Sequence, residues 1–245
     1  MVIITLPAYN EAATLPPLLQ AIREAMAENE IDYRVVIVDD GSSDGTGKVG
    51  RDLSRQMPLT LIEHEQNRGL GDSIRTGLLS ALEDAGDRDI IVTMDSDNTH
   101  TPGLIARMVR GIREGNDVVI ASRYRPGAHI KGVPRYRRLL SSVGGLAFRV
   151  LFPTPNVRDF TSGYRAYRAA VLRQAFDTYG EEFIAQSGFT CMVDILLKLR
   201  SLDAIISEVP LILRYDLKEG VSKMLVMRTI RDTLWLMVTR RLGGQ

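Results

Sequence analysis

The sequence predicts an α/β protein with a mainly parallel central sheet flanked by helices. In the first half of the chain, short β-branched runs alternate with amphipathic stretches, the pattern of consecutive β-α-β units. Polar and acidic clusters at residues 9–11, 39–44 and 95–97 follow three of the predicted strands. Ligands bind beyond the carboxyl ends of strands in such sheets, so we expect a site at this edge.

The first half of the chain supplies most of the predicted sheet. Each apolar run is short, and the stretch after it has apolar residues at helical spacing. Strands are predicted at residues 2–6, 34–38, 59–62, 90–94 and 117–121, and helices at 11–27, 71–85 and 102–113, with another helix opening after the turn-rich segment 39–45.

The second half is less regular. Residues 122–138 form a long connection rich in Arg, Gly and Pro, and a helix should follow to about residue 151, where Pro153 and Pro155 end it. Further along lie a second polar cluster at 156–168, a predicted helix at 190–199 and a strand-like stretch at 204–213.

The composition excludes several classes of protein. A length of 245 residues suits one large domain or two small ones, and a net charge of +1 gives no electrostatic argument for nucleic acid binding. The single cysteine, Cys191, excludes an internal disulfide, and we expect it to be buried. No run approaches the roughly 20 apolar residues of a membrane span, and the amino terminus reads as a strand, which predicts a cytoplasmic protein.

The most informative segment is Asp95-Ser96-Asp97, which directly follows the predicted strand at 90–94. Residues i and i+2 of a strand point the same way, so a slight bend would bring both carboxylates to one point. Mg²⁺ takes one or two carboxylates together with substrate phosphates. The alternative is a solvated strand end, since Asp is common in turns.

Two other nucleotide chemistries lack their motifs. The segment after the first strand is Pro7-Ala8-Tyr9-Asn10-Glu11, not the glycine fingerprint of dinucleotide-binding proteins, and the Walker A pattern is missing. A nucleotide-diphosphate sugar fits better, because its diphosphate needs a bridging cation that Asp95 and Asp97 could hold. Asp40 could accept hydrogen bonds from the base or ribose.

Several motifs, in order, resemble those of the family 2 inverting glycosyltransferases of the GT-A fold. The second half resembles the polyprenyl-phosphate hexose synthases, of which the dolichyl-phosphate mannose synthases are best known. The motifs that carry the resemblance are the segments 6–11, 38–46, 67–71 and 94–97, and then 121–124, 138–141, 159–168, 208–210 and 222–223.

The resemblance implies a role for each matching residue. The positions that match the nucleoside site are Pro7, Tyr9, Glu11, Val38 and Asp40. Those that match the metal and diphosphate site are Asp95, Ser96 and Asp97, with Arg123 near the phosphates. Arg138 and Ser141 match positions that receive the lipid phosphate, and Arg214 and Lys223 match a late basic pair near both phosphate groups.

The chain departs from the family pattern at two positions. A further metal ligand, often glutamine, is here Thr99, a weaker oxygen ligand, and a glutamate of the late helix is here Asp194. His100 is expected just behind the metal site, whereas His64 and His129 have no assigned role.

The implied reaction transfers a hexose to a polyprenyl or dolichyl monophosphate with inversion, using Mg²⁺ or Mn²⁺. The phosphate acceptor is already ionised near neutral pH, so no dedicated general base is required. Arginine suits the acceptor side because its planar fork binds phosphate oxygens bidentately. GDP-mannose is the favoured donor, and UDP-glucose remains a competitor.

The tail, residues 223–245, interleaves Met, Leu and Trp with arginines, as in a helix that lies in a membrane interface. We therefore expect a catalytic domain at 1–222, with a donor half at 1–121 and an acceptor half at 122–222, peripheral on the cytoplasmic face of a membrane. The alternatives for the tail are packing on the domain, a homodimer contact or a membrane-anchored partner.

The sequence is compatible with two alternative functions. One is a family 2 transferase with a soluble or protein-bound acceptor. The other is a catalytically silent nucleotide-sugar-binding or scaffold protein.

Overall fold

The computed structural model describes residues 1–133, 148–186, 188 and 190–217. Its main sheet has the strand order β3-β2-β1-β4-β7-β5-β8, and β7 alone in this sheet runs antiparallel to its neighbours. The predicted mainly parallel sheet is therefore confirmed. The strands are β1 (Val2–Ala8), β2 (Tyr33–Asp39), β3 (Leu59–Glu63), β4 (Ile90–Thr93), β5 (Val118–Ser122), β7 (Arg165–Arg168) and β8 (Ile206–Pro210).

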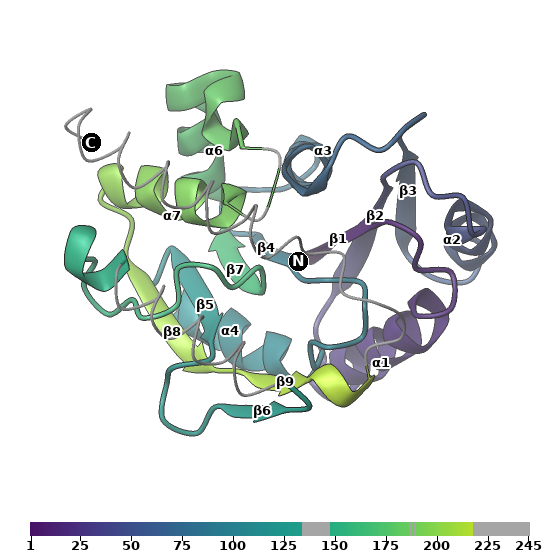
Figure 1. Cartoon of the computed structure of the whole chain (residues 1–245), viewed down its shortest axis with the longest axis horizontal. Coiled ribbons are helices and arrows are strands. Elements are labelled where there is room, and N and C mark those ends of the chain that lie inside the picture. The colour runs from purple at the N-terminus through teal and green to yellow at the C-terminus, as the bar shows by residue number, and fades with distance from the viewer. Residues whose placement is uncertain (134–147, 187, 189, 218–245) are drawn as a thin grey trace.

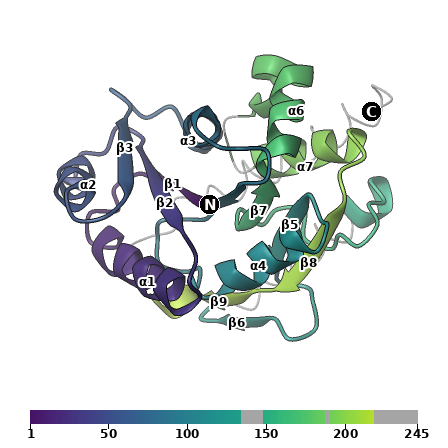
Figure 2. The same ribbon diagram turned by 180° about the vertical axis from the view of Figure 1, so that it is seen from behind.

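Helices cover both faces of the sheet (Figures 1 and 2). One face carries α3, α6 and α7, and the other carries α1 and α4, with α2 beside β3 at one end. The bounds are α1 (Leu15–Glu28), α2 (Thr46–Ser54), α3 (Leu70–Glu83), α4 (Leu104–Arg113), α6 (Ala169–Tyr179) and α7 (Cys191–Ser201).

Two hydrophobic cores follow from the alternation of side chains along the strands. In β1, Ile3 joins the core beneath α3, α6 and α7, whereas Val2 and Ile4 join the core beneath α1 and α4. Cys191 is fully buried in the first of these cores, as the sequence predicted. Both faces of the sheet are thus apolar, which leaves the strand ends as the place for polar groups.

Most predicted bounds differ by one or two residues, and two elements differ by more. Helix α1 begins at Leu15, four residues later than predicted, because Glu11 accepts the N–H groups of Thr14 and Leu15 in a turn and prolines follow at the first helical positions. The strand-like stretch at 204–213 divides into β8 and β9 (Ile212–Arg214), because the Leu211 carbonyl pairs with the His129 N–H instead.

The sequence interpretation missed β7, and with it the helix α6 that follows. The sequence pattern indicates only a polar cluster at residues 156–168, because Arg165 and Arg168 interrupt the apolar pattern of a strand. In the structure Arg165 is fully buried, and its guanidinium donates to the carbonyls of Phe160 and Met192, both at 2.8 Å. Those carbonyls compensate the burial of its polar head.

A small ribbon lies at the lower edge of the molecule in Figure 1. It pairs β6 (His129–Lys131), also missed from the sequence, in parallel with β9. An isolated bridge joins Leu213 to His100, and the Arg214 N–H donates to the Thr99 carbonyl at 2.9 Å. The ribbon therefore lies against the loop that follows β4.

Candidate active site

Three polar loops meet at one edge of the sheet. Strands β2, β1 and β4 are adjacent and parallel, so the segments 39–44, 9–11 and 95–97 all leave the sheet at the same end. The sequence predicted this grouping, and the topology confirms it.

The loops after β1 and β2 are bound to each other by side chains. Ser42 Oγ accepts the N–H of Asn10 at 2.8 Å, and Thr46 Oγ1 accepts the N–H of Glu11 at 2.8 Å. Asp44 accepts the N–H of Ala12 at 3.0 Å. Burial would raise the pKa of Asp44, but bonds from Thr46 and backbone N–H groups outweigh it, and the pKa lies below its usual value. These contacts hold Glu11 beside the second loop.

Asp40 is buried and organises a fourth loop. Its Oδ1 accepts the Arg68 N–H at 2.9 Å and lies 2.7 Å from His64 Nδ1, while Oδ2 accepts the Gly69 N–H at 2.8 Å. Both oxygens are therefore engaged in holding the turn that enters α3. The structure thus gives Asp40 a role in loop architecture, and direct contact with a nucleoside stays a prediction.

The other residues matched to the nucleoside site differ in exposure. Tyr9 is 38% exposed and Glu11 half-buried, so both can face a ligand. The Val38 side chain is fully buried in the core, so it could contact a nucleoside only through its main chain. The Pro7 carbonyl accepts a hydrogen bond from Ser96 Oγ at 2.7 Å, which ties the ends of β1 and β4 together.

Asp95 and Asp97 follow β4 in different environments. The Asp95 side chain is 41% exposed, whereas Asp97 is 9% exposed. Asp97 Oδ1 accepts from Thr99 Oγ1 at 2.7 Å and from the Thr99 N–H at 3.2 Å. Thr99 therefore orients Asp97 in this structure, and its role as a metal ligand stays a prediction.

His100 lies behind Asp95, as the sequence predicted. Its Nδ1 accepts the Asp95 N–H at 3.2 Å, and its Nε2 is 3.8 Å from Asp95 Oδ2. The ring is buried and stacks on Tyr164, with centroids 4.8 Å apart. This packing fixes the main chain from which the exposed carboxylate projects.

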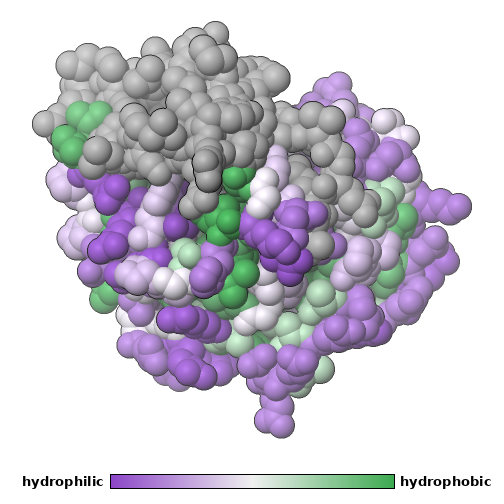
Figure 3. All heavy atoms as spheres, turned by 60° about the horizontal axis from the view of Figure 1, so that its bottom comes forward, coloured by the Kyte–Doolittle hydropathy of each residue, from purple (hydrophilic) through white to green (hydrophobic). Residues whose placement is uncertain are grey.

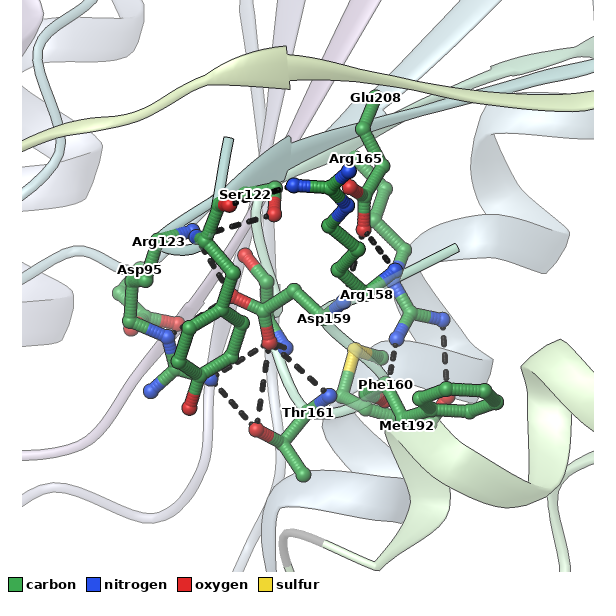
Figure 4. A network of polar contacts seen from close by, with 12 residues as sticks. Asp95, Ser122, Arg123, Arg158, Asp159, Phe160, Thr161, Arg165, Met192 and Glu208 are labelled. Atoms are coloured by element: carbon green, nitrogen blue, oxygen red, sulfur yellow. Dashed lines mark hydrogen bonds and ion pairs between the residues drawn. The ribbon is translucent and has the colours of Figure 1, made fainter. Parts of the chain in front are cut away.

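Arg123 is held by a buried carboxylate. Its Nε and Nη2 donate to the two oxygens of Asp159 at 2.8 and 2.6 Å, and Nη2 also donates to Thr161 (Figure 4). Burial alone would raise the pKa of Asp159, but the Arg123 guanidinium and backbone N–H groups hold it below its usual value. Burial would lower the pKa of Arg123, but Asp159 raises it, with smaller contributions from Tyr124 and Asp95, so Asp95 lies near this guanidinium.

Arg214 reaches the site through β9. Its main chain binds Thr99, and its guanidinium pairs with Asp216 at 3.0 and 3.1 Å. Lys131 contacts the same carboxylate at 3.2 Å. The side-chain bond from Arg214 holds the pKa of Asp216 at about 2, with further help from Lys131. Two cations thus share one carboxylate close to the loop after β4.

The remaining predicted residues, Arg138, Ser141 and Lys223, lie outside the described residues, as does the tail at 223–245. Asp194 is described and buried, where it pairs with Lys198 at 2.7 Å. Within the part of the chain that the structure describes, no helix has the length and apolarity that crossing a membrane requires.

Sequence reasoning missed three side chains that shape this edge. His64 bonds Asp40 and, through Nε2 at 3.1 Å, the Thr76 hydroxyl of α3. Asp159 anchors Arg123, and Glu208 binds the segment that carries Asp159. Asp159 and Glu208 both begin motifs that carried the resemblance, but their partners are 36 and 49 positions away along the chain.

Comparison with known proteins finds relatives whose names specify mannose transfer or mannose-lipid synthesis. The chain is 34% identical over 224 residues to an undecaprenyl-phosphate mannosyltransferase of Micrococcus luteus, covering 91% of this chain and 87% of the relative. It is 31% identical over 196 residues to a dolichol-phosphate mannosyltransferase of Pyrococcus furiosus, covering 80% and 52%. A polyprenol monophosphomannose synthase of Mycolicibacterium smegmatis is 29% identical over 224 residues, covering 91% and 80%.

Solved structures share the fold at lower identity. Glucosyl-3-phosphoglycerate synthase of Mycobacterium tuberculosis, solved with Mn²⁺ and UDP-glucose, has a TM-score of 0.66 at 21% identity, covering 97% of this chain and 78% of that one. Mannosyl-3-phosphoglycerate synthase of Rubrobacter xylanophilus has a TM-score of 0.65 at 19% identity, covering 100% and 74%. These likenesses confirm the GT-A fold.

The family assignment follows from a match across most of the chain. Residues 3–176, which run from within β1 to within α6 and include the loops after β1, β2 and β4, match the model of glycosyl transferase family 2. The resemblance drawn from the motifs is confirmed: the chain belongs to glycosyl transferase family 2.

Proposed function

We propose that this enzyme transfers mannose from GDP-mannose to a polyprenyl monophosphate, with inversion at the anomeric carbon. The observation that carries the proposal is that three relatives, aligned over 80 to 91% of this chain, are mannosyltransferases or mannose synthases whose names specify undecaprenyl, dolichol or polyprenol as the lipid. The polar edge of the sheet supplies groups of the kind that this reaction needs.

The donor side rests on Asp95 and Asp97. Two hard carboxylate oxygens fit Mg²⁺ or Mn²⁺, and no group of three or more metal-binding side chains occurs among the described residues. Substrate phosphates would then complete the shell, which matches a nucleotide-sugar donor. The cation, when bound, neutralises charge that develops on the leaving nucleoside diphosphate. Thr99 orients the Asp97 carboxylate, and His100 holds the main chain of Asp95.

The acceptor side rests on arginines. The lipid phosphate attacks as an ionised oxygen, so the protein has to bring two anions together and needs no proton acceptor. Arg123 lies beside Asp95 with its guanidinium fixed by Asp159, where it can contact phosphate oxygens of the donor. We propose Arg138 and Ser141 for the lipid phosphate, and Arg214 and Lys223 as further cations toward both phosphates.

The proposal includes the organisation of the chain. Residues 1–121 form the donor half and residues 122–222 the acceptor half of one catalytic domain, which works at the cytoplasmic face of a membrane. We propose that residues 223–245 bring the domain to that surface, because a polyprenyl chain stays in the bilayer.

The test is a panel of radiolabelled nucleotide sugars with a short polyprenyl phosphate and Mg²⁺ or Mn²⁺. We expect transfer from GDP-mannose, loss of transfer with a chelator, loss in Asp97→Ala, and an inverted anomeric centre in the product. Preference for UDP-glucose would change the donor, and transfer only to a water-soluble acceptor would overturn the lipid assignment. A retained configuration would exclude a single displacement.

A further inference from the structure

We propose that Glu208 is a positioning residue for Arg123, acting through the segment 158–163. The inference rests on the proposed function in one respect, that Arg123 contacts substrate phosphates. Glu208 itself stands in β8, paired with Ile120 of β5, and none of the described residues that its side chain contacts is one that we assign to substrate. Its influence on the reaction would pass through main-chain contacts.

The contact begins at a single buried oxygen. Glu208 Oε1 accepts the N–H groups of Arg158 and Asp159, at 2.6 and 2.7 Å, and the side chain is 0% exposed. Two consecutive N–H groups converging on one oxygen fix the direction of the chain at this point. The peptide that they fix is the one from which the Asp159 carboxylate projects.

The next contact passes from Asp159 to Arg123. The Asp159 carboxylate accepts the Arg123 main-chain N–H at 3.0 Å in addition to the two guanidinium bonds. It also accepts the Ser162 N–H at 3.1 Å, which closes the turn after it. The position of the Arg123 fork is therefore set by the position of one carboxylate, and that carboxylate is set by Glu208 (Figure 4).

The far end of the segment is anchored independently and reaches the donor carboxylate. Arg165 holds the Phe160 carbonyl together with that of Met192 in α7. A Cβ atom added at Gly163 would lie 3.3 Å from Asp95 Oδ1, so the chain passes directly beside Asp95. Glu208 and Arg165 thus clamp a segment that contacts Asp95 at one end and Arg123 at the other, and this segment sets the spacing between them.

The surroundings of Glu208 indicate that it acts as a hydrogen-bond acceptor and not through its negative charge. Glu208 Oε2 lies 3.8 Å from Arg125 Nε, too far for a direct hydrogen bond to that guanidinium. Burial raises the pKa of Glu208, and the hydrogen bonds from the Arg158 and Asp159 N–H groups and from Ser122 offset this only in part. What Glu208 supplies is one well-placed acceptor oxygen, which a glutamine carbonyl can also supply.

The test compares three substitutions at this position with a matched control. Glu208→Leu removes the acceptor, Glu208→Asp withdraws it by one methylene, and Glu208→Gln keeps it. Asp117→Leu is the control, because Asp117 likewise bonds a main-chain N–H, that of Ile205 at 3.0 Å, and a guanidinium, that of Arg168, at the opposite end of β5 and β8. For each variant we would measure kcat, donor KM, the unfolding midpoint and the exchange rate of the Arg123 Nε–H by ¹⁵N NMR.

A misplaced Arg123 should lower kcat by on the order of 100-fold in Glu208→Leu, since a displacement of about 1 Å can cost that much. Donor KM should stay within about threefold, Glu208→Asp should show the same defect in smaller measure, and Glu208→Gln should restore kcat. The Arg123 Nε–H should exchange faster in the Leu and Asp variants. Asp117→Leu should lower the unfolding midpoint without changing kcat.

Three results would overturn the inference: a wild-type kcat in folded Glu208→Leu, a Gln variant as poor as the Leu variant, or loss of kcat in Asp117→Leu equal to that in Glu208→Leu. If Glu208→Leu does not fold, Glu208→Asp decides, and wild-type kcat and Nε–H exchange there reject the role. Should the wild type fail to use polyprenyl phosphate, the proposed function fails while the Nε–H exchange rates still test Glu208.

Discussion

Three acidic residues at the site, Asp40, Asp159 and Asp95, fall into two groups by what surrounds them. Asp40 and Asp159 are buried, and both of their carboxylate oxygens accept hydrogen bonds from main-chain or side-chain donors. Asp95 projects with 41% of its side chain exposed. A buried carboxylate with several donors shapes the protein, whereas an exposed carboxylate can receive a ligand at little cost in desolvation. Sequence position alone does not distinguish the two groups.

Replacement of Asp95 or Asp97 should weaken metal-dependent nucleotide binding. Asp95→Asn and Asp97→Asn each remove a charged oxygen ligand, so the Kd for GDP in the presence of Mn²⁺ should rise about tenfold or more, ~1.4 kcal/mol. Isothermal titration with Mn²⁺ and with a chelator measures the effect. Asp84→Asn, whose side chain is 79% exposed at the end of α3, should bind as wild type. If the substitutions raise the Kd for GDP by the same factor in the presence of the chelator as with Mn²⁺, the two carboxylates do not act through a cation.

The Asp159–Arg123 pair should make stability depend on pH in acid. The pKa of Asp159 is lowered from the 3.8 of the free side chain, so its contribution to stability is full above that pH and is lost as the pH falls through the folded-state pKa. Asp159→Asn should cost about 3 kcal/mol near neutrality, because it leaves Arg123 without a charged partner. Urea unfolding of both proteins between pH 7 and pH 3 should show the gap narrowing below about pH 4. A constant gap would contradict this account.

At the scale of elements, β7 is a strand that the hydrophobic pattern of the sequence does not predict. The strands next to it, β4 and β5, are continuous apolar runs, and both were predicted to within a residue or two. Strand β7 carries Arg165 between them, which is stable only because the carbonyls of Phe160 and Met192 receive its guanidinium. These partners lie five residues before and 27 residues after it, and no local pattern announces the second.

Prediction of the site is limited in the same way, because some of its side chains have partners in distant parts of the chain. The strand ends that carry Tyr9, Asp40 and Asp95 were predicted because each follows an apolar run, and parallel strands bring such ends together. The role of His64 was missed, since its bond to Asp40 depends on how β3 and the loop after it pack beside β2. Periodicity identifies elements and their ends, but side-chain partners between distant elements require the tertiary structure.

Gly41, in the loop after β2, packs against the loop between β3 and α3, and this contact gives a prediction at the scale of elements. Gly41 has φ +69°, and a Cβ added there would lie 2.5 Å from the carbonyl carbon of Gln66. Gly41→Ala should therefore lower the free energy of unfolding by about 1–2 kcal/mol because of the left-handed backbone, and further because of the clash with Gln66. Displacement of the loop that carries Asp40 and Gly41 should also weaken nucleotide binding. Gly103→Ala is the control, because φ is −57° and no heavy atom lies within 4 Å of the added Cβ. Unfolding midpoints and the Kd for GDP check both variants.

An unchanged unfolding midpoint in Gly41→Ala would mean that the loop between β3 and α3 moves to accommodate the added Cβ without loss of stability. The close approach at Gly41 would then not hold the Asp40 loop in place, and the nucleoside side of the site would be adaptable. A lower midpoint with unchanged Kd would separate the stability of the loop from binding.

The whole molecule presents a face that bears on membrane association. On the side that carries β6 and β9, hydrophobic side chains form a narrow strip between hydrophilic ones in the described residues (Figure 3). A strip of this kind offers little apolar area for insertion into a bilayer, where binding strength scales with buried apolar area and attraction to anionic lipids. Membrane affinity should then depend on residues 223–245, whose sequence combines Trp, Leu and Met with arginines.

Removal of residues 224–245 should abolish flotation with liposomes that contain anionic lipid, and salt should weaken flotation of the full chain, because surface charges are screened within about 8 Å at physiological ionic strength. Substituting glutamine for Arg228, Arg231, Arg240 and Arg241 in the full chain should give an intermediate result, since the apolar residues remain. Circular dichroism and GDP binding would verify that the shortened domain is still folded. Equal flotation of the full and shortened chains would assign membrane contact to the catalytic domain itself, and flotation of neither would favour a partner or a second copy as the ligand of the tail.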